Sequence, residues 1–223
     1  MKNSGFIGID LGGTNVRVGL ITEEGETLHS ITEPIQANAG PENGIQKIVT
    51  IIDVIIDHTG IKPKGIGFGA TGPVDHKNGI INNPFTLTTW ENVDVVTPIR
   101  ERFGIPVCLE NDADVAALGE SWMGAGVGYQ NVAVVTVGTG IGTAFIRDGE
   151  IFRGFNQLHP EGGHIPIDPN GPKCYCGARG CWEVLASGSA IADQAKKLLF
   201  EYPDSNIRID RDAHRLDAKS VIA

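Results

Sequence analysis

Two segments of this chain repeat one pattern of a strand, a glycine turn and a second strand. The first segment occupies 6–21 and the second 132–146. A charged turn with a glycine follows each segment, and an apolar residue follows that turn, so a third strand is predicted in both places. Because the pattern recurs once and far along the chain, it favours two related lobes over a solenoid of stacked repeats.

Strands and helices alternate between the two segments. The predicted strands are 64–70 and 105–110, and the predicted helices are 43–58, 93–103 and 114–123. Asp114 is expected to cap the last of these helices. This order of elements predicts an α/β fold with helices on the faces of a sheet.

The predicted lobes are 1–118 and 119–223, with the glycine-rich stretch 124–130 as the link. The second lobe is expected to contain a helix over 189–200 and another that starts at Asp217. A second lobe as long as the first would extend beyond the last residue, so two strands are expected to be missing. We therefore expect a C-terminally truncated chain of a protein roughly a hundred residues longer, with an apolar helix face and a sheet edge uncovered.

Three of the four cysteines form a cluster shortly after a histidine. They are Cys174, Cys176 and Cys181, and the histidine is His164. Three thiolates and one imidazole suit a structural Zn²⁺, whereas a disulfide would leave one thiol over. The N-terminus lacks the pattern of a signal peptide, so a reducing, cytoplasmic compartment is expected, where clustered cysteines favour a metal. Cys108 lies in an apolar run and is expected to be a buried core thiol.

The charge and hydropathy of the chain limit the classes of partner that it is expected to bind. The net charge is −9, without a basic stripe, which argues against a nucleic-acid surface. No apolar run approaches the length of about 20 residues that a membrane span requires. Only about five residues precede the first predicted strand, so no helix-turn-helix is expected ahead of it. An acidic protein can still bind phosphates through backbone amides and a divalent cation.

The two glycine turns are candidate phosphate sites, because glycine lets backbone N–H groups approach phosphate oxygens closely. They consist of Gly12, Gly13 and Thr14 in the first segment and Gly138, Thr139 and Gly140 in the second. Neither turn is a Walker loop, because no Gly-Lys-Ser/Thr follows it. Neither is a dinucleotide fingerprint, because a strand rather than a helix follows the turn. Asp10, at the end of the first strand, is predicted to hold Mg²⁺ through water. The alternative for Asp10 is a turn residue that bonds local amides.

Four features together resemble the ROK family of repressors and sugar kinases. They are the turn at Asp10, the triplet 110–112, Glu161-x-x-His164, and Cys-x-Cys-Gly-x-x-Gly-Cys-x-Glu ending at Glu183. The resemblance covers essentially the whole chain and is nearest to the bacterial glucokinases. It implies an actin-like, ribonuclease-H-like fold of two lobes, with ATP between the lobes, a hexose at the hinge, and a homodimer.

The resemblance also implies roles for individual residues. Asp112 matches the catalytic base, and a carboxylate at a strand end can accept the proton of a sugar hydroxyl during phosphoryl transfer. The implied sugar ligands are Gly72, Asn111, Glu161, His164 and Glu183. His164 is implied to bind zinc through one nitrogen and sugar through the other. The other interpretation of Asp112, a helix cap, suits Asp114 better.

Two positions differ from the usual family pattern. Asp114 stands where relatives commonly carry Asn, and the His159-Pro160 pair is similar to some fructokinases. His159 itself is expected at the surface or in packing. The predicted function is ATP-dependent phosphorylation of glucose at its 6-hydroxyl. The alternatives are a fructokinase, an N-acetylmannosamine or N-acetylglucosamine kinase, and a non-catalytic, sugar-sensing transcriptional regulator of the same family.

Overall fold

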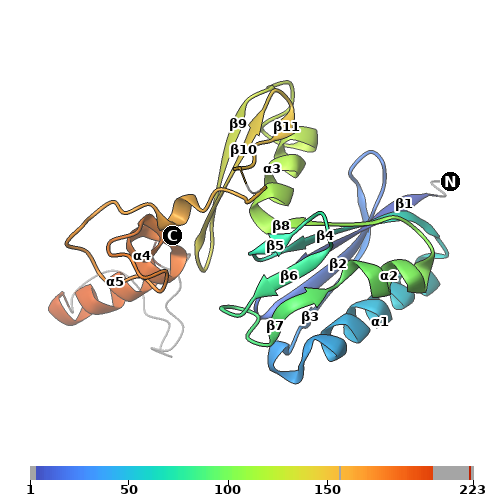
Figure 1. The fold of residues 1–223 in the computed structure, drawn as a ribbon, viewed down its shortest axis with the longest axis horizontal. Helices are drawn as coiled ribbons and strands as arrows, with labels where there is room; N and C mark the ends of the chain where they lie inside the picture. The colour runs from blue at the N-terminus through green and yellow to red at the C-terminus, as the bar shows by residue number, and fades with distance from the viewer. Residues whose placement is uncertain (1–3, 156, 203–220, 222–223) are drawn as a thin grey trace.

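The computed structural model describes residues 4–155, 157–202 and 221. Its largest sheet has five strands in the order β3-β2-β1-β4-β8 (Figure 1). The strands are β1 (Gly5–Leu11), β2 (Asn15–Ile21), β3 (Thr27–Pro34), β4 (Pro63–Ala70) and β8 (Val107–Asn111). The first three are antiparallel neighbours, and β4 and β8 continue the sheet in parallel. The predicted α/β class is confirmed, and the predicted order of elements is confirmed apart from three short strands that follow β4.

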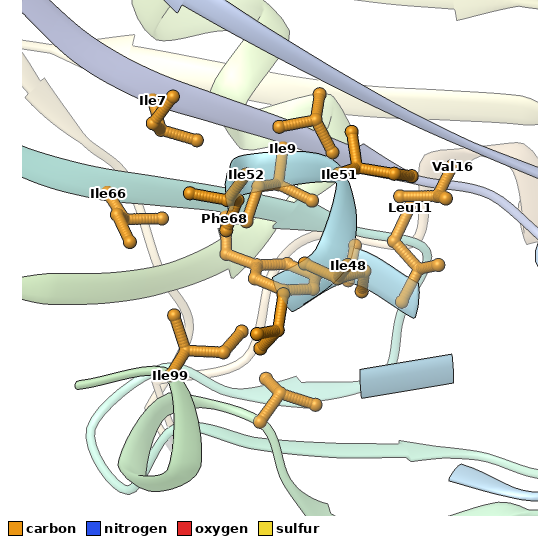
Figure 2. Close-up of a cluster of buried hydrophobic side chains, with 14 of the residues drawn as sticks. Ile7, Ile9, Leu11, Val16, Ile48, Ile51, Ile52, Ile66, Phe68 and Ile99 are labelled. Atoms are coloured by element: carbon orange, nitrogen blue, oxygen red, sulfur yellow. The ribbon is translucent and has the colours of Figure 1, made fainter. Parts of the chain in front are cut away.

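One face of this sheet is covered by two helices, α1 (Pro41–Thr59) and α2 (Val96–Phe103). Alternate residues of β1 point toward these helices, because side chains along a strand alternate between its two faces. Figure 2 shows the result, a core in which Ile7, Ile9 and Phe68 pack with side chains from α1 and α2. This layer holds β1, β4 and β8 in register, so their carboxyl ends meet at one edge.

The opposite face of the sheet is open among the described residues. Phe6 is exposed there, and so is Cys108, which makes the prediction of a buried core thiol wrong. The Cys108 side chain leaves the sheet on the face away from α1 and α2. The neighbouring helix α3 (Asp112–Met123) also exposes an apolar stripe of Val115, Leu118 and Trp122.

A small antiparallel sheet of three strands lies between β4 and α2. Its strands are β5 (Val74–Asp75), β6 (Ile80–Asn83) and β7 (Trp90–Asp94). Sequence reasoning missed it and began the following helix three residues early. The helix begins at Val96 because the Asp94 carboxylate accepts hydrogen bonds from the backbone N–H groups of Val96 and Thr97.

The second lobe is built on a sheet of three strands in the order β11-β10-β9. They are β9 (Val132–Val137), β10 (Ile141–Arg147) and β11 (Glu150–Ile151). Among the described residues this sheet has three strands, whereas the first has five. Helix α3 packs on it through Ala113 and Ala117 against Ala144 and Ile146. The predicted boundary after residue 118 falls inside α3, and we propose that the second lobe begins at Asp112.

The remaining elements follow the second sheet or connect earlier ones. They are η1 (Ala37–Ala39), η2 (Gly162–His164), α4 (Trp182–Ala186) and α5 (Gly188–Glu201). The predicted helix over 189–200 is confirmed as α5, whereas the helix predicted to start at Asp217 lies outside the described residues. Across the described part of the chain, no helix combines the length and the apolarity that crossing a membrane requires.

Candidate functional site

The candidate base lies where β8 ends and α3 begins. Asn111 caps the helix, because its side-chain oxygen accepts hydrogen bonds from the N–H groups of Ala113 at 2.8 Å and Asp114 at 3.4 Å. The prediction that Asp114 is the cap is therefore wrong. Asp112 occupies the first helical position, where the positive end of the helix dipole favours a carboxylate. Gly72 lies against the cap, since a Cβ on it would come within 2.8 Å of the Asn111 amide nitrogen.

Charged side chains from two further segments act on Asp112. Although it reaches solvent, the protein around it desolvates the carboxyl and raises its pKa, and the charges of Asp10 and Glu161 raise it further. A backbone hydrogen bond from Ala113 and the charge of His159 act in the opposite direction. The structure thus brings the predicted residues Asp10, Asp112 and Glu161 into one electrostatic group. A carboxyl that has a raised pKa and reaches solvent suits a general base.

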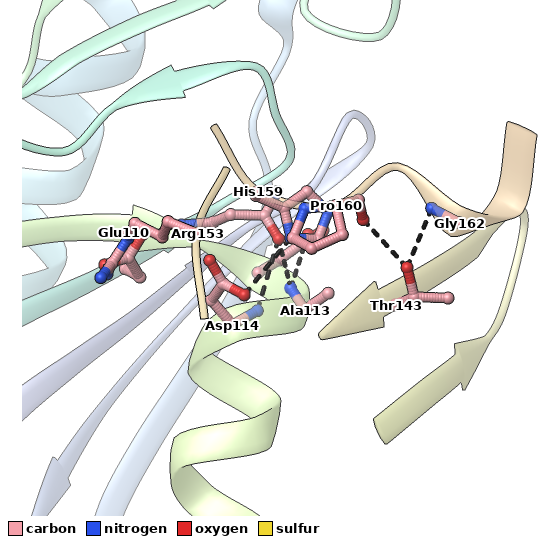
Figure 3. A network of polar contacts seen from close by, with 10 residues as sticks. Glu110, Ala113, Asp114, Thr143, Arg153, His159, Pro160 and Gly162 are labelled. Carbon is pink, nitrogen blue, oxygen red and sulfur yellow. Dashed lines mark hydrogen bonds and ion pairs between the residues drawn. The ribbon is translucent and has the colours of Figure 1, made fainter. Parts of the chain in front are cut away.

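Two charged pairs fasten the loop that carries Glu161 to the segment that carries Asp112 (Figure 3). Arg153 pairs with Glu110, two residues before Asp112. His159 pairs with Asp114, two residues after it, with 3.3 Å between Nδ1 and Oδ1. The side chain of His159 is only 11% exposed, so of the two expected positions, at the surface or in packing, it takes the packed one.

A buried threonine secures the same loop to β10. The hydroxyl of Thr143 donates to the Pro160 carbonyl at 2.9 Å and accepts from the Gly162 N–H at 2.9 Å. The bonds to Pro160 and Gly162 (Figure 3) flank Glu161 and fix its backbone. Sequence reasoning missed Thr143 and Arg153, because their partners lie 17 to 43 residues away in the chain.

The predicted zinc ligands meet in one cluster. The ligand atoms of His164, Cys174, Cys176 and Cys181 all lie within 4.8 Å of one another. The Cys174 Sγ is 3.5 Å from the His164 Nδ1, and the Cys176 and Cys181 sulfurs are 3.6 Å apart. Tetrahedral Zn²⁺ has Zn–S bonds of about 2.3 Å and Zn–N bonds of about 2.0 Å. This geometry places a sulfur and a nitrogen ligand about 3.6 Å apart, and two sulfur ligands about 3.8 Å apart. The donor set therefore fits zinc, with Nδ1 as the histidine ligand.

Packing around the cluster favours a cation. Desolvation raises the pKa of the Cys181 thiol to about 12, and the neighbouring Cys176 and Cys174 add to this effect. A metal ion that replaces the protons would remove the crowding of like charges. The two sulfurs at 3.6 Å are too far apart for a disulfide, whose S–S bond is about 2.05 Å.

Tyr175, between two of the cysteines, reaches the predicted sugar ligands. Its hydroxyl is 3.0 Å from the His164 Nε2, the nitrogen that does not face the cysteines. Desolvation and a hydrogen bond to Glu183 raise the pKa of Tyr175. Its ring also contacts Phe85 of the first lobe, with 6.2 Å between ring centroids. Tyr175 was missed by sequence reasoning, although an aromatic residue between metal ligands is a signal that could have found it.

Glu183 links this region to the second glycine turn. Its Oε2 accepts a hydrogen bond at 2.8 Å from the N–H of Ile141, which directly follows Gly140. Gly140 lies so close that a Cβ on it would be 2.2 Å from the same oxygen. The predicted sugar ligand Glu183 and the predicted phosphate turn are therefore in direct contact.

The two predicted phosphate turns each end a strand at the surface. In the first, the Gly12 N–H donates to the Asn15 carbonyl at 3.0 Å, and Gly13 and Thr14 are exposed. In the second, Gly138 and Thr139 are exposed, and the Gly138 carbonyl accepts from the N–H of Gly188 at 2.8 Å, at the start of α5. A helix N-terminus beside a glycine turn can bind phosphate oxygens. Asp10 is exposed beside the other carboxylates, an oxygen donor set that suits Mg²⁺.

Comparison with known proteins identifies the family. Residues 6–223 match the ROK family. The chain is 36% identical to a glucokinase of Thermotoga maritima over 97% of its own length and 68% of that protein, and 33% identical to the xylose repressor of Bacillus subtilis over 91% and 54%. A ROK family glucokinase from Streptomyces griseus, solved in complex with glucose and AMPPNP, superposes with a TM-score of 0.84 at 32% identity, covering 97% of this chain and 69% of that one. The predicted actin-like fold is thereby confirmed, and the chain belongs to the ROK family.

Proposed function

We propose that this protein is an ATP-dependent hexose kinase that phosphorylates glucose at its 6-hydroxyl, with Asp112 as the general base. The observation that carries the proposal is the position of Asp112 at the β8–α3 junction, beside Gly72 and Asn111 and facing Glu161. A base needs a lone pair directed into an open site and neighbours that orient the hydroxyl. The similarity to glucokinases supports glucose as the substrate.

The chain's own residues divide the work of the reaction. Asn111, Glu161, His164 and Glu183 offer amide, carboxylate and imidazole groups that pair with sugar hydroxyls, and the backbone at Gly72 adds a contact. Asp112 accepts the proton of the 6-hydroxyl as that oxygen bonds to the γ-phosphorus and the bond from phosphorus to the ADP oxygen breaks. The glycine turns at 12–14 and 138–140 would hold the phosphates of ATP. Asp10 would hold Mg²⁺, which would neutralise phosphate charge.

Zinc has a supporting role in this proposal. The ion would be held by His164, Cys174, Cys176 and Cys181, and it would fix the ring of His164 so that Nε2 faces the sugar site. It would also order the loop that leads into α4, on which Glu183 lies. The predicted homodimer is a separate proposal that light scattering would measure.

An ADP-release assay tests the proposed activity. Glucose, mannose, fructose, N-acetylmannosamine and N-acetylglucosamine are compared with Mg²⁺ and ATP, and Asp112→Asn is the matched control. We expect glucose to give the highest kcat/KM and the control to lose most activity. If another hexose gives a higher kcat/KM, the glucose assignment is wrong and the kinase class stands.

A sugar-sensing regulator is the second candidate, because the chain is 33% identical to a xylose repressor over most of its length. The same assay separates the two functions when calorimetric sugar binding is added. A regulator would bind a sugar yet release no more ADP than Asp112→Asn does. A kinase would bind the sugar and lose only turnover in that variant.

A further inference from the structure

A buried carboxylate next to the candidate base has a hydrogen-bond partner among the described residues for only one of its two oxygens. Asp114 is completely buried in the first turn of α3. Its Oδ1 lies 3.3 Å from the Nδ1 of His159, and its Oδ2 has no hydrogen-bond partner among the described residues. Figure 3 shows His159 reaching Asp114 from the loop that leads into Pro160. A buried carboxyl group with so few hydrogen bonds stays ionised only with a positive charge beside it.

His159 can supply that positive charge. Burial lowers the pKa of His159, but the hydrogen bond and the charge of Asp114 outweigh burial, and Glu161 and Asp112 add to the upward shift. The net direction is upward, so the imidazolium form is favoured where an ordinary histidine is losing its proton.

The same cation faces the candidate base. The charged groups that act on Asp112 are Asp10 from β1, and Glu161 and His159 from the loop before η2. Of these, Asp10 and Glu161 are negative and disfavour a second negative charge, whereas His159 is the positive one. The nearby Glu110 is already paired with Arg153. His159 thus balances a group of carboxylates that would otherwise hold the proton on Asp112.

We propose that Asp114 holds His159 as an imidazolium beside Asp112, and that this cation keeps Asp112 ionised and able to act as a base. His159 and Asp114 are positioning residues here, because they act through Asp112 and through the loop that carries Glu161. The proposal rests on the proposed role of Asp112 as a base. The coupling between the charges of His159 and Asp112 holds whether or not the protein turns over a sugar.

The kinetic test is the pH profile of kcat/KM. His159→Gln removes the charge and should move the acid limb to higher pH, whereas His159→Lys keeps the charge and should restore the limb toward that of the parent. The double variant with Asp114→Asn leaves no buried charge unpaired, so it serves if His159→Gln does not fold. His58→Gln, on the surface of α1, is the matched control. An unchanged acid limb in both His159→Gln and the double variant would overturn the proposal.

An NMR titration of the histidine ring protons tests the coupling directly. The His159 signal is assigned by its loss in His159→Gln. Asp114→Asn and Asp112→Asn should each lower the pKa of His159, because each removes a negative charge that favours the imidazolium. A His159 pKa unaffected by Asp112→Asn would overturn the proposal even in an active kinase. A lowered value in a protein without kinase activity would support the coupling and reject only the proposed function.

Discussion

Replacing Gly140 with alanine should weaken hexose binding although residue 140 belongs to the predicted phosphate turn. The new Cβ would lie 2.2 Å from the Glu183 Oε2 and 3.0 Å from its carboxyl carbon. Ordinary contacts begin near 3.4 Å, so the carboxylate must retreat by about 1 Å, which breaks its 2.8 Å hydrogen bond from the Ile141 N–H. A hydrogen bond to a charged group contributes about 1.5–3 kcal/mol. Loss of one such bond between Glu183 and a sugar hydroxyl corresponds to a roughly 10- to 150-fold rise in Kd.

Gly138 provides a matched control within the same turn, because a Cβ there would meet nothing within 4 Å. Calorimetric titration of glucose without nucleotide should therefore give a raised Kd for Gly140→Ala and a Kd near that of the parent for Gly138→Ala. Melting temperatures of both variants show whether the fold is retained. Equal glucose affinities in the two variants would refute the reasoning that Glu183 binds sugar from the position that Gly140 allows.

Four further predictions follow from the site. Metal analysis of reduced protein should find one zinc per chain, and Cys176→Ser should lower both zinc content and hexose affinity; protein free of zinc would contradict this. Asp112→Asn should lower kcat about 10²–10⁴-fold with the hexose Kd little changed, and normal turnover would remove Asp112 from the mechanism. The folded state raises the pKa of His159, so protonated His159 stabilises the folded protein. This contribution to the free energy of unfolding is complete below the unfolded pKa of about 6.5 and is lost as pH rises through the folded pKa. Urea unfolding should show this loss as pH rises above about 6.5, and His159→Gln should show a flatter dependence; parallel curves would contradict it. Tyr175→Phe should tighten hexose binding, because it frees the His164 Nε2, and weaker binding would mean that the hydroxyl itself contacts sugar.

Interactions between residues close in the chain could be predicted from the sequence. The strand, turn and strand of 6–21 follow from alternating side chains and glycines, and the structure contains them as β1 and β2. The candidate zinc cluster is similar, because three of its proposed ligands lie within one short loop and their chemistry suits few other roles. The longer helices and strands of the first lobe were found with small errors at their ends, since local spacing reports an element better than its boundary, whereas the short strands β5, β6 and β7 were missed.

Interactions between residues far apart were decided by the tertiary structure. Whether Asp114 caps a helix or pairs with a histidine depends on His159, 45 residues later. The residues next to Asp114 in the sequence do not predict that contact. Cys108 was expected in the core because its neighbours are apolar, but only the packing of α1 and α2 on one face of the sheet decides which side of β8 is buried. The sequence by itself determined the two strand–turn–strand segments, the glycine turns and the clustering of the candidate metal ligands, because these depend on periodicity and short spacing. The tertiary structure decided which charges surround Asp112, because electrostatic neighbours are set by distance in space.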